Sequence, residues 1–198
     1  MRRLANSIST TETLKQAFLS CLNKQEYEDI TIAELSRRVG INRTTFYFFF
    51  GSKDELFTEL CNAVVERWFQ PFFDLNITKM SRTENVDMEK ELFHELLTWL
   101  MQWRPALQRM TNVRTESFDG FTLFISAFEK KMTAQSIFAT EDEMKRKKYS
   151  LFIKVYAVGL ASILKWWLDE GDGFEANEFH AMIERLRYKG YYSILCDD

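Results

Sequence analysis

The sequence predicts an all-α fold, and three observations lead to this prediction. The chain of 198 residues contains only seven glycines and two prolines, which is little material for the tight turns of a multi-stranded sheet but no obstacle to long helices. Apolar residues make up 46% and charged residues 28% of the chain, which is typical of a globular protein and argues against disorder. Apolar side chains also recur at helical spacing, and helix-capping signatures separate the runs.

The first two predicted helices open with the same capping signature. Ser9 and Glu12 are spaced as a capping box, in which a hydroxyl and a carboxylate bond backbone N–H groups at the start of a helix. Thr31 and Glu34 repeat this spacing and open a second, short helix. That helix is expected to stop at Gly40, because glycine is the residue best suited to a left-handed C-cap.

The next two helices follow with hardly any linker. Asn42 is a good N-cap for a third, short helix that Gly51 closes. Ser52 and Glu55 form another capping box for a fourth helix, which is predicted to run until Pro71 interrupts it. So many helix boundaries within a few dozen residues are typical of a compact helical unit.

The remainder of the chain is predicted to be helical as well. A long helix is expected between the capping pair Thr140 and Glu143 and the stop at Gly171. The other expected segments are a loop over 74–86, a helix that Pro105 ends or kinks, helical stretches over about 105–114 and 118–137, and a last helix from Phe179 to Tyr191.

The chain divides into two predicted domains, residues 1–53 and residues 54–198. Residues 1–53 contain eight Lys or Arg against five Asp or Glu, a net charge of +3, whereas the whole chain has a net charge of −3 and the rest therefore −6. A basic end on an acidic body is expected where only that end meets phosphate. The charge asymmetry therefore favours the first domain as the part that contacts a polyanion.

Residues 31–50 form the pattern of helix, glycine-containing turn and short helix, which is the helix-turn-helix arrangement. The short second helix cannot hold its shape alone, so Phe46 and Phe50, four positions apart, are expected to anchor it against its neighbours. Its leading residues are then free to enter the major groove of DNA, where arginine suits guanine and threonine suits polar edges or a thymine methyl group. The residues expected to face bases are Arg43, Thr44 and Thr45.

Groups suited to phosphate lie around this centre. They are Thr31 at the start of the second helix, Tyr47, and Lys53 at the start of the fourth. Other basic residues, namely Lys15, Arg37 and Arg38, are expected to form a solvated face, and Arg2 and Arg3 are either a minor-groove arm or a frayed terminus.

At this point a resemblance can be stated, on the run DITIAELSRRVGINRTTFYFFFGSKDELF. Its Ile-Ala pair, Gly-Ile, Thr-Phe-Tyr, aromatic triplet and Ser-Lys-Asp-Glu-Leu resemble the DNA-binding domain of the tetracycline-repressor (TetR/AcrR) family over about residues 9–70. The resemblance implies a dimeric transcriptional regulator, in most cases a repressor released by a small ligand. It also implies base contacts by Arg43, Thr44 and Thr45 and backbone contacts by Thr31, Tyr47 and Lys53.

One position departs from the family pattern. Phe49 stands where the family usually has His or Tyr reaching phosphate, and phenylalanine cannot donate a hydrogen bond. In the body, the segment Tyr156–Gly171, with Gly159 and the pair Trp166 and Trp167, is more loosely similar to regulators of the same family without an assigned inducer.

Regulation by a recognition helix favours a two-fold dimer, because one such helix covers only a few base pairs. The last two helices carry small residues beside large apolar ones, which allows another helix to approach closely; the alternative is an internal core. The residues expected at a dimer interface are Val155, Val158, Gly159, Ser162, Trp166, Met182 and Leu186.

Aromatic residues of the central helices suggest a cavity for a small apolar or aromatic inducer. A Phe-rich stripe at helical spacing is equally consistent with plain core packing. The residues expected to line such a pocket are Trp99, Trp103, Phe118, Phe121, Phe124 and Phe128.

Other functions are disfavoured by the sequence. Neither His94 nor His180 lies in a metal-binding motif, the three cysteines form no CxxC pair, and no catalytic constellation, cofactor loop or run of ~18 uncharged apolar residues stands out. We therefore expect a cytoplasmic, non-enzymatic DNA-binding regulator with no metal, no cofactor and no membrane partner. The alternative is a protein-interaction module of the same fold in which DNA binding is lost or secondary.

Overall fold

The computed structural model describes residues 2–74, 82–134 and 139–171, and residues 173, 178, 179, 181, 182 and 185. Within this part of the chain the structure is helical and contains no strand, so the predicted all-α fold is confirmed. The helices are α1 (Arg2–Leu22), α2 (Ile32–Val39), α3 (Arg43–Phe49), α4 (Lys53–Asp74), α5 (Arg82–Asn112), α6 (Gly120–Thr133) and α7 (Glu143–Glu170).

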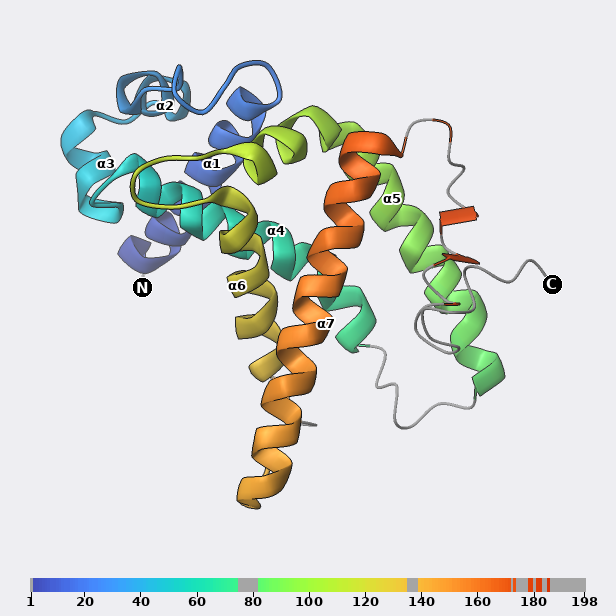
Figure 1. Cartoon of the computed structure of the whole chain (residues 1–198). Helices are drawn as coiled ribbons and strands as arrows, with labels where there is room; N and C mark the ends of the chain where they lie inside the picture. The colour runs from blue at the N-terminus through green and yellow to red at the C-terminus, as the bar shows by residue number, and fades with distance from the viewer. Residues whose placement is uncertain are drawn as a thin grey trace.

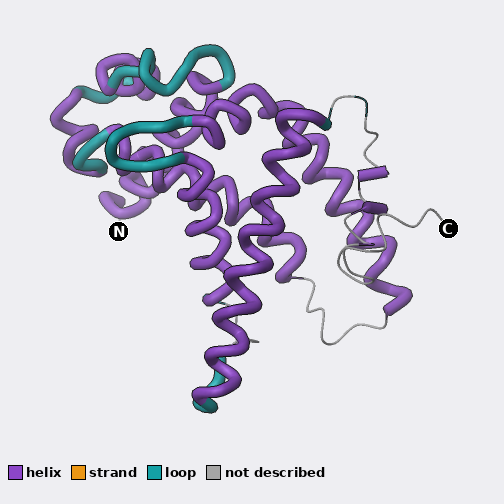
Figure 2. The backbone as a smooth tube through the Cα atoms, in the orientation of Figure 1, coloured by secondary structure: helices purple, strands orange, loops and turns teal. Residues whose placement is uncertain are grey.

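The helices form a small head and a larger body (Figure 1). In the head, α2 and α3 pack on each other, and α2 packs on α1. Helix α4 leaves the head and packs against α6 of the body, while α5 touches α1 on one side and α6 and α7 on the other. Figure 2 shows that the loop between α1 and α2 and the loop between α5 and α6 both lie on the head side of the molecule.

The apolar core is continuous from the head into the body. Phe18, Phe46 and Phe57 are fully buried in the head, and Phe124 and Phe128 are fully buried in the body. Helix α4 supplies buried side chains from Leu56 to Val65, and it contacts both α1 and α6. The head is therefore seated firmly on the body, and the division after residue 53 stays a prediction about domains.

Both prolines lie inside helices, which corrects the predicted boundaries. Helix α4 continues past Pro71 to Asp74, and α5 is one helix that contains Pro105 rather than two that meet there. Helix α5 also begins at Arg82, inside the segment predicted as a loop. A proline removes one helical hydrogen bond, but Ala106 and Leu107 beside it are fully buried, and their packing holds the helix together.

Three helix starts also differ from the predictions. Helix α1 begins at Arg2 instead of Ser9, and α6 begins at Gly120 with Asp119 as its N-cap. The N-cap of α7 is Asp142, whose carboxylate accepts from the Lys145 N–H at 3.0 Å, and not Thr140. The predicted end of α7 at Gly171 is confirmed. Most of the predicted last helix lies outside the described residues.

The turn between α5 and α6 is closed by direct backbone contact. The Gly120 N–H donates to the Val113 carbonyl at 2.8 Å, and a Cβ atom at Gly120 would come within 2.0 Å of the Met110 carbonyl oxygen. This turn carries Phe118 to the head, where its ring stacks on Phe57 at a centroid distance of 5.2 Å and meets the edge of Tyr27 at 5.8 Å. The body thus contributes a ring to the head's aromatic cluster.

Candidate nucleic-acid interface

The turn between α2 and α3 is built as the sequence predicts. The Thr31 hydroxyl accepts from the Glu34 N–H at 3.1 Å and caps the start of α2. Gly40 has φ of 74°, and the N–H groups of Gly40 and Ile41 donate to the carbonyls of Arg37 and Ser36. This pair of bonds is the usual end of a helix at a left-handed glycine, and it lets α3 begin almost at once.

Helix α3 is held at its start by a cap and along one side by two rings. The Asn42 side chain accepts from the Thr45 N–H at 2.8 Å. Phe46 is 0% exposed and Phe50 is buried, with their ring centroids 6.0 Å apart. These contacts fix a helix of seven residues that is too short to be stable alone.

The opposite side of α3 is open to solvent. Arg43 and Thr44 are exposed in its first turn, and Tyr47 is 49% exposed one turn later. Thr45 lies differently, because its hydroxyl also donates to the Asn42 side chain at 3.0 Å and it is only partly exposed. The structure therefore gathers Arg43, Thr44 and Tyr47 on one face and turns Thr45 toward the cap.

Phe48 is a member of this face that the sequence analysis did not single out. Its side chain is 80% exposed, whereas Phe49 is only partly exposed and packs against the core. Position 48 follows Thr44 by one helical turn, so the helical spacing alone was the signal that could have found it. We call Arg43, Thr44, Tyr47 and Phe48 the α3 face.

Lys53 is tied into the head by several contacts. Its ammonium donates to the carbonyls of Tyr27 and Ile30 at 2.8 and 2.9 Å and lies 4.0 Å from the centre of the Tyr27 ring. Burial lowers the pKa of Lys53 despite the neighbouring Asp54 carboxylate, to which the Tyr27 hydroxyl donates. An ammonium has three N–H donors, and the two carbonyls take two of them.

The remaining basic residues of the head are partly engaged. Arg38 forms an ion pair with Glu34 at 2.9 Å, and Lys15 forms one with Glu12. Glu34 also accepts from the Gln25 amide at 2.9 Å, and these hydrogen bonds, with that from Gln25 foremost, lower the pKa of Glu34. Arg37 is exposed. Arg2 and Arg3 lie on α1, but their side chains are outside the described residues.

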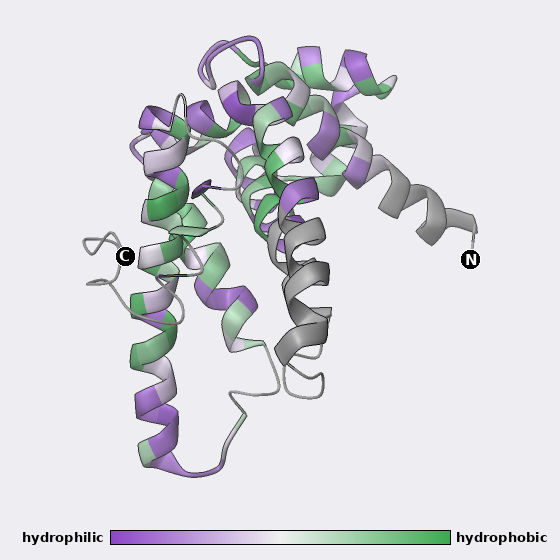
Figure 3. Cartoon of the chain, turned by 90° about the vertical axis from the view of Figure 1, so that its right-hand side faces the viewer, coloured by the Kyte–Doolittle hydropathy of each residue, from purple (hydrophilic) through white to green (hydrophobic). Residues whose placement is uncertain are grey.

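The residues predicted at a dimer interface lie mostly along one exposed side of α7. Val155 is 57% exposed, Val158 and Ser162 are exposed, and Gly159 and Trp166 are half-buried. Leu151 and Phe152 extend the same exposed apolar stripe. Figure 3 shows α7, the long helix with the hydrophilic lower end, turning hydrophobic along its middle. Met182 packs against the core instead, and Leu186 lies outside the described residues.

The residues predicted to line a pocket are separated in the structure. Trp99 and Trp103 line a groove of about 810 Å³ between α1, α4 and α5. Phe118 joins the aromatic cluster of the head, Phe121 packs at the edge of the core, and Phe124 and Phe128 are buried within it. The six side chains do not surround one cavity, because those of α6 point into the core and those of α5 point toward α1 and α4.

Metal ligands and membrane-spanning helices are the two other features that bear on function. Among the described residues, no group of three or more His, Cys, Asp or Glu side chains is placed to hold a metal ion. Helix α7 is long and apolar enough to cross a membrane by length and composition only, and a third of its apolar window is buried inside the protein.

The chain was compared with known proteins. Residues 16–60 match the family model described as bacterial regulatory proteins, tetR family. Over 190 residues the chain is 27% identical to YxbF of Bacillus subtilis (strain 168), an uncharacterised HTH-type transcriptional regulator. The alignment covers 92% of this chain but 46% of that protein, so the chain spans about half the length of this curated relative.

Solved structures share the fold. The chain is similar to NalD of Pseudomonas aeruginosa, the secondary repressor of the MexAB-OprM multidrug efflux pump, with a TM-score of 0.51 and 17% identity over 93% of this chain and 96% of that one. It is also similar to Thermus thermophilus FadR in complex with lauroyl-CoA, with a TM-score of 0.52 and 15% identity over 91% of this chain and 94% of that one.

Proposed function

We propose that the chain, whose residues 16–60 match the model of bacterial regulatory proteins of the tetR family, is a sequence-specific DNA-binding transcriptional regulator of the cytoplasm. The observation that carries the proposal is the division of α3 into two sides. Phe46 and Phe50 are buried, so Arg43, Thr44 and Tyr47 are held outward on a rigid helix. A helix presented in this way fits the major groove of B-DNA.

The proposed contacts follow from the chemistry of each side chain. Arg43 and Thr44 contact base edges, and Phe48 adds an apolar contact to a thymine methyl group or a deoxyribose. Thr45 touches bases only with the lone pairs that its bond to Asn42 leaves free. Thr31, Tyr47 and the remaining donor of Lys53 contact phosphate and set the register of the head on the duplex.

The regulator acts as a homodimer in this proposal. The exposed stripe Leu151, Phe152, Val155 and Val158 is apolar, continuous along one side of α7 and suited to a second copy of the same helix. Val155, Val158, Gly159, Ser162 and Trp166 belong to this interface. Two recognition helices related by two-fold symmetry then read an inverted repeat.

We also propose that the protein represses transcription and that a small apolar or aromatic ligand releases it. Repression by covering a promoter needs no surface beyond the DNA-binding face. One structural neighbour is a repressor in complex with lauroyl-CoA, which supports release by a small-molecule ligand but not this particular chemical class. The groove beside Trp99 and Trp103 is the site that we propose for this ligand.

Selection of bound sequences from random duplexes tests the proposal. We expect an inverted repeat, and a plot of log K against log salt with a negative slope of several units. Arg43→Ala should relax the preference at one base position by ~1 to 3 kcal/mol. Arg146→Ala, which removes the same charge from the exposed start of α7, is the control. A protein-interaction module of the same fold would enrich no sequence at all.

A further inference from the structure

A short segment of α5, residues 104–109, binds the C-terminal ends of two other helices. On one side it contacts α1, which belongs to the head, and on the other it contacts α7, which carries the exposed stripe. The last carbonyls of a helix lack partners within the helix, and basic or amide side chains are favourable there. The segment therefore lies where head and body are joined by directed bonds in addition to packing.

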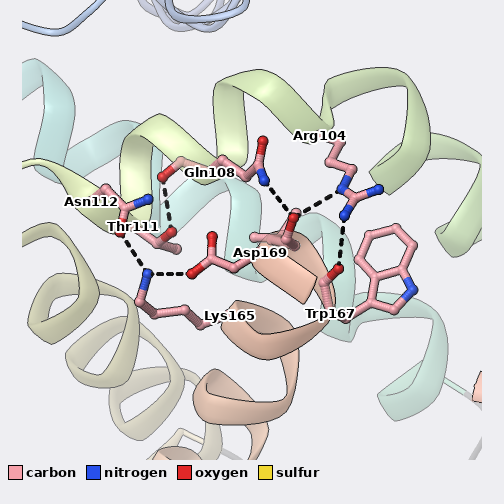
Figure 4. A network of polar contacts seen from close by, with 8 residues as sticks. Arg104, Gln108, Thr111, Asn112, Lys165, Trp167 and Asp169 are labelled. Atoms are coloured by element: carbon pink, nitrogen blue, oxygen red, sulfur yellow. Dashed lines mark hydrogen bonds and ion pairs between the residues drawn. The ribbon is translucent and has the colours of Figure 1, made fainter. Parts of the chain in front are cut away.

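The contacts with α7 come from Arg104 and Gln108. The Arg104 guanidinium donates to the carbonyls of Leu168 and Trp167 at 2.9 and 3.3 Å and lies 5.5 Å from the centre of the Trp167 ring system. Gln108 donates to the same Leu168 carbonyl at 2.5 Å. Figure 4 shows both side chains converging on the end of α7, beside the ion pair of Lys165 with Asp169.

The contacts with the end of α1 and the residues after it come from Ala106 and Arg109. Arg109 donates to the Leu22 carbonyl at 3.0 Å and forms an ion pair with Glu26 at 2.7 Å. The N–H of Ala106, the residue directly after Pro105, donates to the Asn23 side chain at 3.3 Å. A proline has no backbone N–H, so one hydrogen bond of the helix is missing at Pro105. Asn23 binds the helix in this same turn.

These contacts alternate along one and a half turns of a single helix. Positions 104 and 108 face α7, and positions 106 and 109 face α1. Ala106 and Leu107 between them are fully buried, so this part of α5 has no room to rotate without breaking one set of bonds. The angle between α1 and α7 is thus fixed by a rigid element bonded to both.

We propose that residues 104–109 of α5 set the orientation of the DNA-binding head on the dimer helix, and that Asn23 and Arg109 are positioning residues for operator binding. The inference rests on the proposed function, since it concerns two heads held at the spacing of two half-sites. Neither residue touches DNA. If the orientation of the heads is less fixed, one head of the dimer still binds one half-site as before. The other head then meets the second half-site at a lower effective concentration.

The test compares the natural protein with Asn23→Ala/Arg109→Ala on two duplexes, the selected operator and a duplex with one half-site. We expect about tenfold weaker binding of the double variant to the operator, less than about twofold change on the half-site, and a broader tolerance of spacers longer or shorter by one base pair. Asn23→Asp keeps an oxygen acceptor for the Ala106 N–H. With Arg109 intact, this single variant should show the same spacer preference as the natural protein. Arg146→Ala is again the charge-matched control.

A second measurement reports the orientation without DNA. Spin labels at Glu28→Cys in the head and Lys147→Cys on α7 are read as a distance distribution, with Cys196→Ser added and labelled chains diluted in unlabelled protein. Cys21 and Cys61 are buried and stay unlabelled. The double variant should broaden the distribution, whereas Arg146→Ala should not.

The outcomes separate this inference from the proposed function. An unchanged distance distribution would show that the two residues do not set the orientation of the head. An equal loss of affinity on both duplexes would show that they affect the binding of each head alone, and either result would overturn the positioning role. Failure of the natural protein to bind any duplex, together with a broadened distribution in the double variant, would refute operator binding and leave the positioning of the head established.

Discussion

Lys53 has a structural role that its position in the motif does not suggest. The sequence places it among the phosphate contacts, whereas its ammonium bonds two carbonyls of the turn before α2 and lies over Tyr27. These bonds join the start of α4 to the residues that precede Thr31. Lys53 therefore supports the geometry of the start of α2, which is the end that we propose contacts phosphate.

Replacement of Lys53 should consequently lower stability as well as binding. Lys53→Ala removes two charge-assisted hydrogen bonds, so we expect a loss of about 1.5 to 3 kcal/mol in the free energy of unfolding. Urea unfolding measures this loss, with Lys24→Ala as the control, since Lys24 is exposed in the same head. Equal stability of the two variants would mean that the carbonyl contacts contribute nothing.

Phe48 allows a complementary prediction on the α3 face. Because its ring is 80% exposed, Phe48→Ala should change the free energy of unfolding by less than about 0.5 kcal/mol. If the ring is buried against DNA, the same variant should lose roughly 1 to 3 kcal/mol of operator binding. Fluorescence anisotropy titration measures the loss. Unchanged affinity would remove Phe48 from the DNA contacts.

Among the elements, α3 depends most completely on its neighbours. Phe46→Ala leaves a cavity beneath a helix of seven residues, and we expect a loss of about 3 to 5 kcal/mol in unfolding free energy. Operator binding should fall further than in Phe48→Ala, although Phe46 does not face DNA. Urea unfolding and anisotropy titration on the same two variants check both statements. Native stability of Phe46→Ala would show that the cap at Asn42 holds α3 without the ring.

Glu34, near the start of α2, is expected to make the stability of the protein depend on pH. Hydrogen bonds from Gln25 and Arg38 hold the pKa of Glu34 below its usual value, so on acidification the unfolded chain binds the proton first. The stability that Glu34 contributes is therefore present above about pH 4.5 and is lost as the pH falls through the lower, folded pKa. Melting temperatures over this range should fall more steeply for the natural protein than for Glu34→Gln. Parallel curves would contradict the prediction.

The elements also show what a sequence can predict. The boundaries of α2 and α3 follow from local chemistry, because Thr31, Gly40 and Asn42 act on backbone groups within a few residues. Pro105 was predicted to end or kink its helix, and it does not end it, because burial of its neighbours, which depends on distant residues, keeps α5 continuous. The pocket set stays a prediction, because helical spacing places Trp103 and Phe124 on apolar faces without saying which helices those faces meet.

At the scale of the whole molecule, the exposed side of α7 has the clearest consequence. Val155→Asp places a carboxylate in the middle of the apolar stripe, where a second copy would bury it at a cost of several kcal/mol. We expect the dimer dissociation constant to rise by at least about a hundredfold. Sedimentation equilibrium measures it.

The matched control for this prediction is Ser150→Asp. It adds the same charge to an exposed position of α7 on the side that borders Thr133 and Tyr149. Dimerisation of Ser150→Asp should be unchanged. If Val155→Asp dimerises as tightly as Ser150→Asp, the second copy binds elsewhere.

The closed turn at Gly120 has a consequence for how the molecule transmits movement. With no gap between the two backbones there, α6 cannot slide along α5 by itself, and any tilt of α6 drags the ring of Phe118 across Tyr27 and Phe57. The rings that Phe118 contacts belong to the same core cluster as Phe46 of α3. Gly120→Ala would place a Cβ atom 2.0 Å from the Met110 carbonyl oxygen, so the backbones of α5 and α6 would have to move apart at this turn.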